Sequence, residues 1–122
     1  MYTPPKRRKL TKAERQEVYD KCHGHCAYCG CEITIQQMQV DHVQPISVAG
    51  DDVMENMLPA CRSCNYYKSA MPLYMFRQAV EDWTKVLARD SVTYRNAVRF
   101  GQVLPNKHPV VFYFEREGGK DG

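Results

Sequence analysis

Two cysteine pairs constrain this chain more than any other feature of its 122 residues. They are Cys26-x-x-Cys29 and Cys61-x-x-Cys64, and 31 residues lie between them. Two intervening residues let both sulfurs of a pair reach one ion, so the two pairs predict a tetrahedral thiolate site for Zn²⁺. Four thiolates leave no position for water, and the zinc is therefore expected to be structural. The long gap predicts that a functional segment is inserted between the pairs.

The ligand set has alternatives, because the chain contains six cysteines. The other candidate ligands are Cys22, Cys31, His23 and His25. Gly30 directly after Cys29 favours the Cys26–Cys29 pair, since a knuckle needs a residue that accepts a tight turn. Nothing in the sequence indicates export, so we expect reduced thiols rather than a disulfide framework.

Length and composition fit one ordinary domain, which we expect to span residues 1–122. The hydrophobic content of 43% is enough for a modest core. No apolar stretch has the length of a signal peptide or a membrane span. We therefore expect a cytoplasmic protein of a bacterial or phage-infected cell, without membrane contact.

Basic residues are concentrated near the start of the chain. The net charge is only +3, but four cations are consecutive, namely Lys6, Arg7, Arg8 and Lys9. We expect residues 1–10 to form a flexible basic arm that suits a polyanionic partner such as a nucleic acid. The alternative is a solvated chain end without a partner.

Local patterns predict the elements of the first 70 residues. Thr11-Lys12-Ala13-Glu14 has the form of a capping box, so a helix is expected over about 11–21. The β-prone runs 33–35 and 38–43 predict an irregular hairpin. A loop around Pro45 and Gly50 precedes a short helix expected over about 61–69.

Residues 71–116 are expected to form a helical and strand extension of the core. Pro72 suits a first helical position, and the apolar residues that follow recur at helical spacing: Phe76, Val80, Trp83 and Leu87. We interpret this apolar face as core. Ser91 is a candidate cap for a further helix that ends at Gly101, and the apolar run 110–114 predicts a β-strand. Only residues 118–122 have the composition of a loose tail.

The segment between the cysteine pairs and just beyond it carries a specific resemblance. It reads Val40-Asp41-His42-Val43, then Glu55-Asn56-Met57, then Cys64-Asn65-Tyr66-Tyr67-Lys68. In this order, over residues 22–70, these motifs resemble the zinc-containing branch of the HNH endonuclease family. The resemblance implies an α+β fold with a small zinc-stabilised ββα-metal core, to which flanking helices and a C-terminal strand are added. It also implies a metal-dependent hydrolase of phosphodiester bonds in DNA.

Spacing on the second predicted helix supports the resemblance independently. Cys64, Asn65 and Lys68 follow Cys61 by three, four and seven residues, so all four share one helical face. Zinc bound at this face would present Asn65 to the strand that bears Asp41 and His42.

The resemblance assigns a role to each residue of the inserted segment. His42 is the implied general base, and Asn56 supports it through hydrogen bonds. Asp41 and Asn65 are the implied ligands of the catalytic ion, and their oxygens suit Mg²⁺ or Mn²⁺ better than a second zinc. Asn65 stands where the family often has a histidine. Adjacent residues of an ideal strand point to opposite faces, but the resemblance implies that Asp41 and His42 act together.

DNA is the expected partner, with Arg62 and Lys68 as further candidates for contacts to its backbone. One site cuts one strand at a time, so we expect a monomer that nicks. The competing interpretation is a zinc-stabilised nucleic-acid-binding module that does not cut. A redox role fits less well because a thioredoxin-like βαβ pattern is absent. Duplex DNA, branched DNA and RNA all stay open as substrates, and short HNH proteins of this kind resemble phage-encoded members.

Overall fold

A computed structural model describes residues 9–45, 52–106 and 109–120 of the chain. Three of the four consecutive cations, Lys6, Arg7 and Arg8, lie outside the described residues. The chain forms two compact units. The first consists of Met1–Leu73 with Val111–Gly122, and the second is Tyr74–Val110.

The first unit opens with helix α1, Lys12–Asp20. The predicted capping box is present: the Glu14 amide donates to Thr11 Oγ1 at 3.1 Å, and the Thr11 amide donates to Glu14 Oε1 at 2.9 Å. These two bonds satisfy backbone groups that a helix start leaves unpaired. The inner face of α1 contributes the fully buried Val18.

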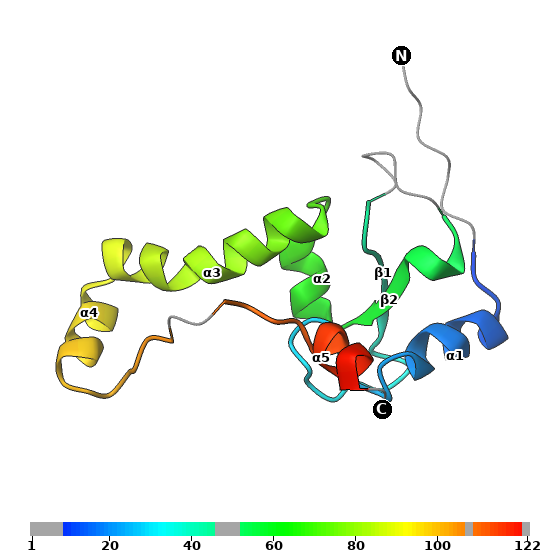
Figure 1. The fold of residues 1–122 in the computed structure, drawn as a ribbon, viewed down its shortest axis with the longest axis horizontal. Helices are drawn as coiled ribbons and strands as arrows, with labels where there is room; N and C mark the ends of the chain where they lie inside the picture. Colours follow the sequence, from blue (N-terminus) through cyan, green and yellow to red (C-terminus); the bar gives the residue numbers. More distant parts are fainter. Residues whose placement is uncertain (1–8, 46–51, 107–108, 121–122) are drawn as a thin grey trace, which may run out of the picture. The chain divides into compact units, whose positions relative to one another are not determined.

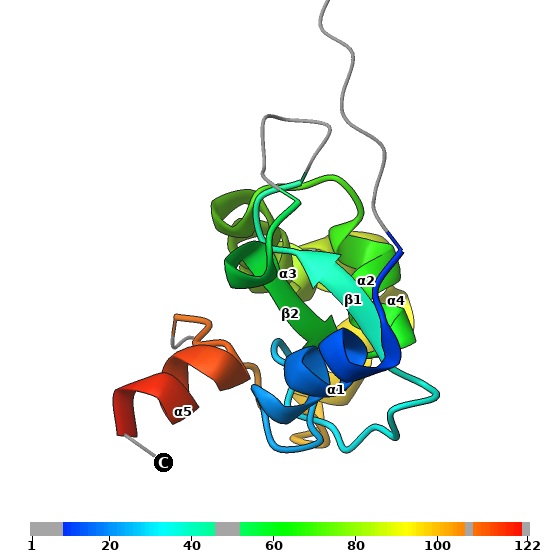
Figure 2. The same ribbon diagram turned by 90° about the vertical axis from the view of Figure 1, so that its right-hand side faces the viewer.

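A two-stranded antiparallel sheet lies beside α1 (Figures 1 and 2). Strand β1 is Gln39–His42 and strand β2 is Met57–Ala60, with Gln39 opposite Ala60 and His42 opposite Met57. The short 3-10 helix η2, Met54–Asn56, leads directly into β2. The prediction that residues 33–35 pair with 38–43 is wrong, because the partner of β1 comes from the far side of the loop. Thr34 and Gln37 instead form a turn through mutual side-chain to backbone bonds.

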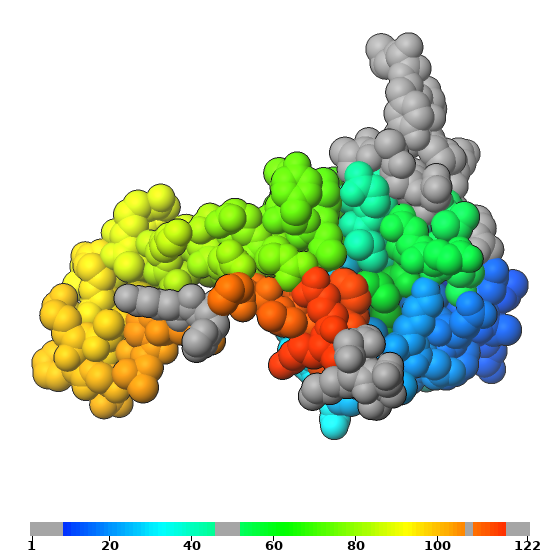
Figure 3. All heavy atoms as spheres, viewed as in Figure 1, coloured from blue at the N-terminus to red at the C-terminus, as the bar shows by residue number. Residues whose placement is uncertain are grey.

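Helix α2, Arg62–Lys68, follows β2 and agrees with the helix predicted over 61–69. A small apolar core joins α1 to the sheet, and its buried members are Val18, Ile33, Met38 and Met57. Figure 3 shows α1 in blue directly against the green surface of η2 and β2. In the described part of this unit, the core is small enough that a metal site would add substantially to its stability.

The second unit contains α4, Val92–Arg99, and most of α3, Leu73–Asp90. Ser91 caps α4 as predicted, since its hydroxyl accepts from the Tyr94 amide. The interpretation of the apolar face of α3 as core is wrong over its second half. Phe76 is buried, but Trp83 and Leu87 are 43% and 44% exposed. Helical spacing identifies an apolar face without showing what covers it.

The C-terminal strand predicted over 110–114 is not formed, and helix α5 spans Tyr113–Lys120 instead. The amide of Phe112 donates to Glu115 Oε1 at 2.8 Å, in the manner of a carboxylate that caps a helix start. Phe112 itself is buried. It is the one buried residue of the run 110–114, since Val111 is 54% exposed. The helix includes residues that we expected to form a tail. None of the described helices has the length and hydropathy to cross a membrane.

Candidate functional site

Four cysteines of the first unit come together at the edge of the sheet. The Sγ atoms of Cys26, Cys29, Cys61 and Cys64 all lie within 4.8 Å of one another. The first pair sits on a turn that Gly30 closes, with its amide donating to the Cys26 carbonyl at 3.0 Å and a φ of 83°. The second pair is placed by α2, for which Cys61 is the N-cap and accepts from the Cys64 amide.

Contacts with β2 and α5 fix the first pair in place. The amide of Ala27 donates to the Pro59 carbonyl at 2.8 Å, so the turn is bonded to the outer edge of β2. A Cβ atom at Gly30 would lie 2.9 Å from the Tyr113 ring. Glycine is therefore required there both by the backbone conformation and by the approach of α5.

The electrostatics of the cluster call for a cation. A hydrogen bond from the Cys64 thiol lowers the pKa of Cys26 to about 4, and the same bond raises the pKa of Cys64. Sulfurs this close cannot all ionise together without a positive charge among them. A soft tetrahedral set of four thiolates is the donor chemistry of a structural zinc. The alternative ligands Cys22, Cys31, His23 and His25 are not part of the cluster among the described residues.

Asp41 on β1 is buried, and its two polar partners among the described residues contact the same carboxylate oxygen. The Tyr28 hydroxyl donates to Oδ2 at 2.5 Å, and Lys68 Nζ lies 3.0 Å from the same atom. Burial, and then the neighbouring Asp41 carboxylate, raise the pKa of the Tyr28 phenol above its ordinary range. Tyr28 therefore stays a donor at any physiological pH.

Lys68 has a different place from the one predicted. We expected it to contact a DNA backbone, but its side chain is fully buried and paired with Asp41. Its ammonium also donates to the His42 carbonyl at 2.9 Å. The assignment to DNA binding is therefore wrong, because the ammonium faces β1 and not the surface. Arg62, six residues earlier on α2, is exposed.

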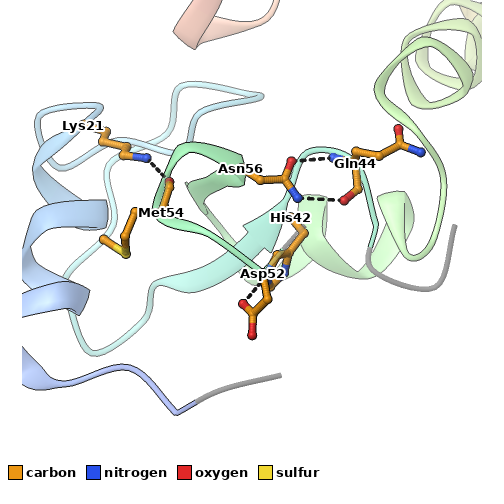
Figure 4. A network of polar contacts seen from close by, with 6 residues as sticks. All are labelled: Lys21, His42, Gln44, Asp52, Met54 and Asn56. Carbon is orange, nitrogen blue, oxygen red and sulfur yellow. Dashed lines mark hydrogen bonds and ion pairs between the residues drawn. The ribbon is translucent and has the colours of Figure 1, made fainter. Parts of the chain in front are cut away.

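His42 is the last residue of β1, and its imidazole is held by Asp52 (Figure 4). Nε2 lies 3.0 Å from Asp52 Oδ1, while the buried Nδ1 has no hydrogen-bond partner within the described residues. A carboxylate only accepts, so the neutral imidazole carries its proton on Nε2 and has a lone pair on Nδ1. His42 and Asp52 also line a hollow of about 290 Å³, together with Lys9 and Arg15.

Asn56 and Lys21 each hold a backbone segment near this histidine (Figure 4). The Asn56 carboxamide accepts from the Gln44 amide at 2.9 Å and donates to the Gln44 carbonyl at 2.8 Å. Lys21 Nζ donates to the carbonyls of Met54 and Met57 at 2.5 and 2.8 Å. The chain after β1 and the chain before β2 are thereby held in one geometry.

The structure brings most of the predicted site residues to one sheet, but in two groups. Asp41 contacts Tyr28 and Lys68, whereas His42 contacts Asp52 and lines the hollow. Their side chains thus have different neighbours, as strand alternation requires. Asn65 lies on α2 one turn before Lys68, which ties that helix to β1. No hydrogen bond of the Asn65 carboxamide occurs among the described residues.

The motifs did not identify Asp52 or the polar roles of Tyr28 and Lys68. Asp52 lies ten residues after His42 beyond a loop, and no spacing rule relates two such positions. Tyr28 lies inside the first Cys-x-x-Cys pair, and that motif specifies the two cysteines but not the residues between them. For Lys68, the shared face with Asn65 was the available signal.

The geometry defines a small α+β module: a four-cysteine cluster, a two-stranded sheet and a helix around a buried Asp-His pair. The family model for HNH endonuclease matches residues 26–70. These residues are therefore an HNH endonuclease module, and the resemblance noted from the sequence is confirmed.

Two relatives extend the match. The CRISPR-associated endonuclease Cas9 of Corynebacterium diphtheriae is 31% identical over 85 residues, which are 69% of this chain and 7% of that protein. The crystal structure of the type II-C Cas9 enzyme from Actinomyces naeslundii matches 60% of this chain and 9% of that chain, with 26% identity and a TM-score of 0.50. This chain therefore spans less than a tenth of the length of either relative.

Proposed function

We propose that this chain is a metal-dependent endonuclease that hydrolyses a phosphodiester bond in one strand of DNA, with His42 as general base. The observation that carries the proposal is the arrangement of His42 within the HNH module. Its Nε2 is held by Asp52, and its buried Nδ1 has no hydrogen-bond partner among the described residues. The residue also lines a hollow to which two cations contribute.

His42 has the properties that a general base needs. Asp52 selects the tautomer in which Nδ1 is unprotonated, and it would stabilise the imidazolium after the proton is taken from water. Lys9 and Arg15 at the same hollow would attract a phosphate. Arg15 also donates to the Ile35 carbonyl at 2.9 Å, which holds its guanidinium near the sheet.

Asp41 and Asn65 are the residues that would hold the catalytic ion. A carboxylate and a carboxamide are hard oxygen donors, so the set fits Mg²⁺ or Mn²⁺. When bound, such an ion supplies charge to the scissile phosphate and to the departing 3′ oxygen. The chain contributes the orientation of both side chains, through β1 for Asp41 and through α2 for Asn65.

The divergence of Asp41 and His42 agrees with an in-line displacement. In such a reaction the attacking water and the leaving oxygen lie on opposite sides of phosphorus. Two adjacent residues at the end of a strand point to opposite faces, so a phosphate across the end of β1 would meet the base on one side and Asp41 on the other. Asn56 would preserve this arrangement by fixing the backbone at Gln44.

Supercoiled plasmid tests the proposal. The wild-type chain with Mg²⁺ or Mn²⁺ should convert plasmid to the nicked circle, and excess EDTA should stop the reaction. His42→Ala should still bind DNA, while its cleavage rate falls by roughly 10²- to 10⁴-fold, the usual contribution of a general base.

His23→Asn is the matched control, because it removes an exposed imidazole outside the site. His23 has a φ of 54°, which asparagine tolerates, so this variant should cut at the wild-type rate. DNA binding without cleavage by the wild type would favour the non-cutting module instead. Cleavage by His42→Ala at the wild-type rate would exclude His42 as the base.

A further inference from the structure

We propose that Tyr28 and Lys68 are positioning residues that hold Asp41 by its Oδ2 atom and so present Oδ1 to the divalent cation. The inference rests on the proposed function, in which Asp41 is a ligand of that cation. It adds a link between the cysteine cluster and the catalytic ion, since Tyr28 lies between Cys26 and Cys29.

The two oxygens of Asp41 differ in their surroundings. Oδ2 accepts from the Tyr28 hydroxyl at 2.5 Å and lies 3.0 Å from Lys68 Nζ. Oδ1 takes part in no hydrogen bond among the described residues. It is also not one of their fully buried side-chain atoms that lack a partner, which means that Oδ1 is not fully buried. A carboxylate can accept at both oxygens, so the placement of both donors on Oδ2 leaves Oδ1 available.

Each of the two donors is itself immobilised. The Tyr28 ring makes edge contacts with Phe112 and Phe114, at centroid distances of 5.3 and 6.1 Å. Lys68 is fully buried and also donates to the His42 carbonyl. Because neither donor can follow a moving carboxylate, the Asp41 side chain is held in one orientation. Metal ligands are commonly oriented by such outer partners.

The change in cation affinity on removal of a donor shows whether the donor positions Oδ1 or only reduces the negative charge of the carboxylate. A donor on Oδ2 withdraws negative charge from the carboxylate, so by charge alone its removal would strengthen cation binding. If the donor positions Oδ1, its removal weakens cation binding. Loss of an outer partner typically costs 10- to 100-fold in metal affinity.

The test is Mn²⁺ binding to the full zinc-loaded chain, followed by electron paramagnetic resonance. Tyr28→Phe removes only the hydroxyl, and we expect the dissociation constant of Mn²⁺ to rise about 10-fold or more with unchanged zinc content. Tyr19→Phe is the matched control, since the Tyr19 hydroxyl donates to the Ile33 carbonyl at 2.8 Å, away from Asp41. That variant should bind Mn²⁺ as the wild type does.

A second measurement uses the wild-type chain and so does not depend on the folding of a variant. The buried Tyr28 hydroxyl proton should give a downfield proton resonance that persists when Mg²⁺ is added, because Oδ2 stays bonded to Tyr28 in the loaded site. Loss of that resonance on Mg²⁺ binding would overturn the proposal.

The outcomes separate this inference from the proposed function. Suppose that the wild type binds Mn²⁺ and cuts DNA, but Tyr28→Phe binds Mn²⁺ as tightly or more tightly. Then Tyr28 does not position Asp41, while the proposed endonuclease activity is still supported. If the wild type neither binds Mn²⁺ nor cuts, both are wrong. Equal weakening in Tyr19→Phe would also overturn the inference, because it would show a general loss of stability.

Discussion

The Asp41–Lys68 ion pair shows how one residue in this site can serve two purposes. Both side chains are almost completely buried, and their charges lie 3.0 Å apart. Asp41 is the proposed ligand of the catalytic ion, yet its carboxylate also compensates a buried ammonium. Removal of one partner of such a pair leaves an unpaired buried charge, which typically costs about 3–5 kcal/mol.

We therefore expect Asp41→Ala to lower the free energy of unfolding by about 3–5 kcal/mol, besides stopping cleavage. The double variant Asp41→Ala/Lys68→Met should recover most of that stability, since an apolar replacement of a whole buried pair is often neutral. It should remain inactive. Urea denaturation of the single and double variants measures the difference, and a double variant as unstable as the single would contradict this account of the pair.

Among the elements, the antiparallel sheet depends on the connections that flank it. β1 and β2 each have four residues, and a sheet this small is marginal without support. Asn56 holds the amide and the carbonyl of Gln44, just after β1. Lys21 donates to the carbonyl of Met54, before β2, and to that of Met57, its first residue. Asn56 thus orders the segment that follows His42, and Lys21 orders the segment that enters β2.

Asn56→Ala should slow cleavage while zinc content stays at the wild-type level. The variant loses both bonds to Gln44, and each such bond contributes about 0.5–1.5 kcal/mol. The loss of both bonds is expected to lower the unfolding free energy by about 1–3 kcal/mol. Asn56→Asp keeps only the acceptor for the Gln44 amide and should lie between the two. Cleavage by Asn56→Ala at the full rate would show that the loop geometry does not matter to the chemistry.

For the whole molecule, the four-cysteine cluster joins segments that are distant in the sequence. It links the turn at residues 26–30 to the start of α2, and the same turn bonds to β2 and to α5. The amides of Tyr113 and Phe114 donate to the carbonyls of Tyr28 and Ala27 at 3.1 and 2.8 Å. The first unit should therefore depend on zinc as a whole.

Two kinds of metal removal should give different results. A chelator that withdraws zinc from thiolates should unfold the first unit, with loss of the amide signals of β1 and β2 in heteronuclear NMR. A brief treatment that removes only Mg²⁺ or Mn²⁺ should stop cleavage, leave those signals unchanged and be reversed by adding the ion back. Zinc-free protein that keeps the β1 and β2 signals would contradict a structural role for the cluster.

The sequence by itself determined the features that depend on short spacings. A capping box involves four consecutive residues, a Cys-x-x-Cys pair also four, and the shared face of Cys61, Cys64, Asn65 and Lys68 eight. Over such distances the geometry of a helix or a turn decides which side chains meet. For this reason α1, α2 and the cap of α4 were predictable. The order of the motifs along the chain also predicted the match of residues 26–70 to the HNH endonuclease family.

Only the tertiary structure decided the partners that meet across loops or between elements. β1 pairs with residues 57–60 and not with its nearest β-prone neighbour, because burial against α1 selects the strand that completes the core. Lys68 turns inward because a buried Asp41 needs a cation. The predicted strand over 110–114 gives way to α5, because the Phe112 amide bonds to the Glu115 carboxylate and the next two amides bond to the turn at residues 27–28. These outcomes depend on competition for burial and for hydrogen bonds among distant segments, which local spacing does not encode.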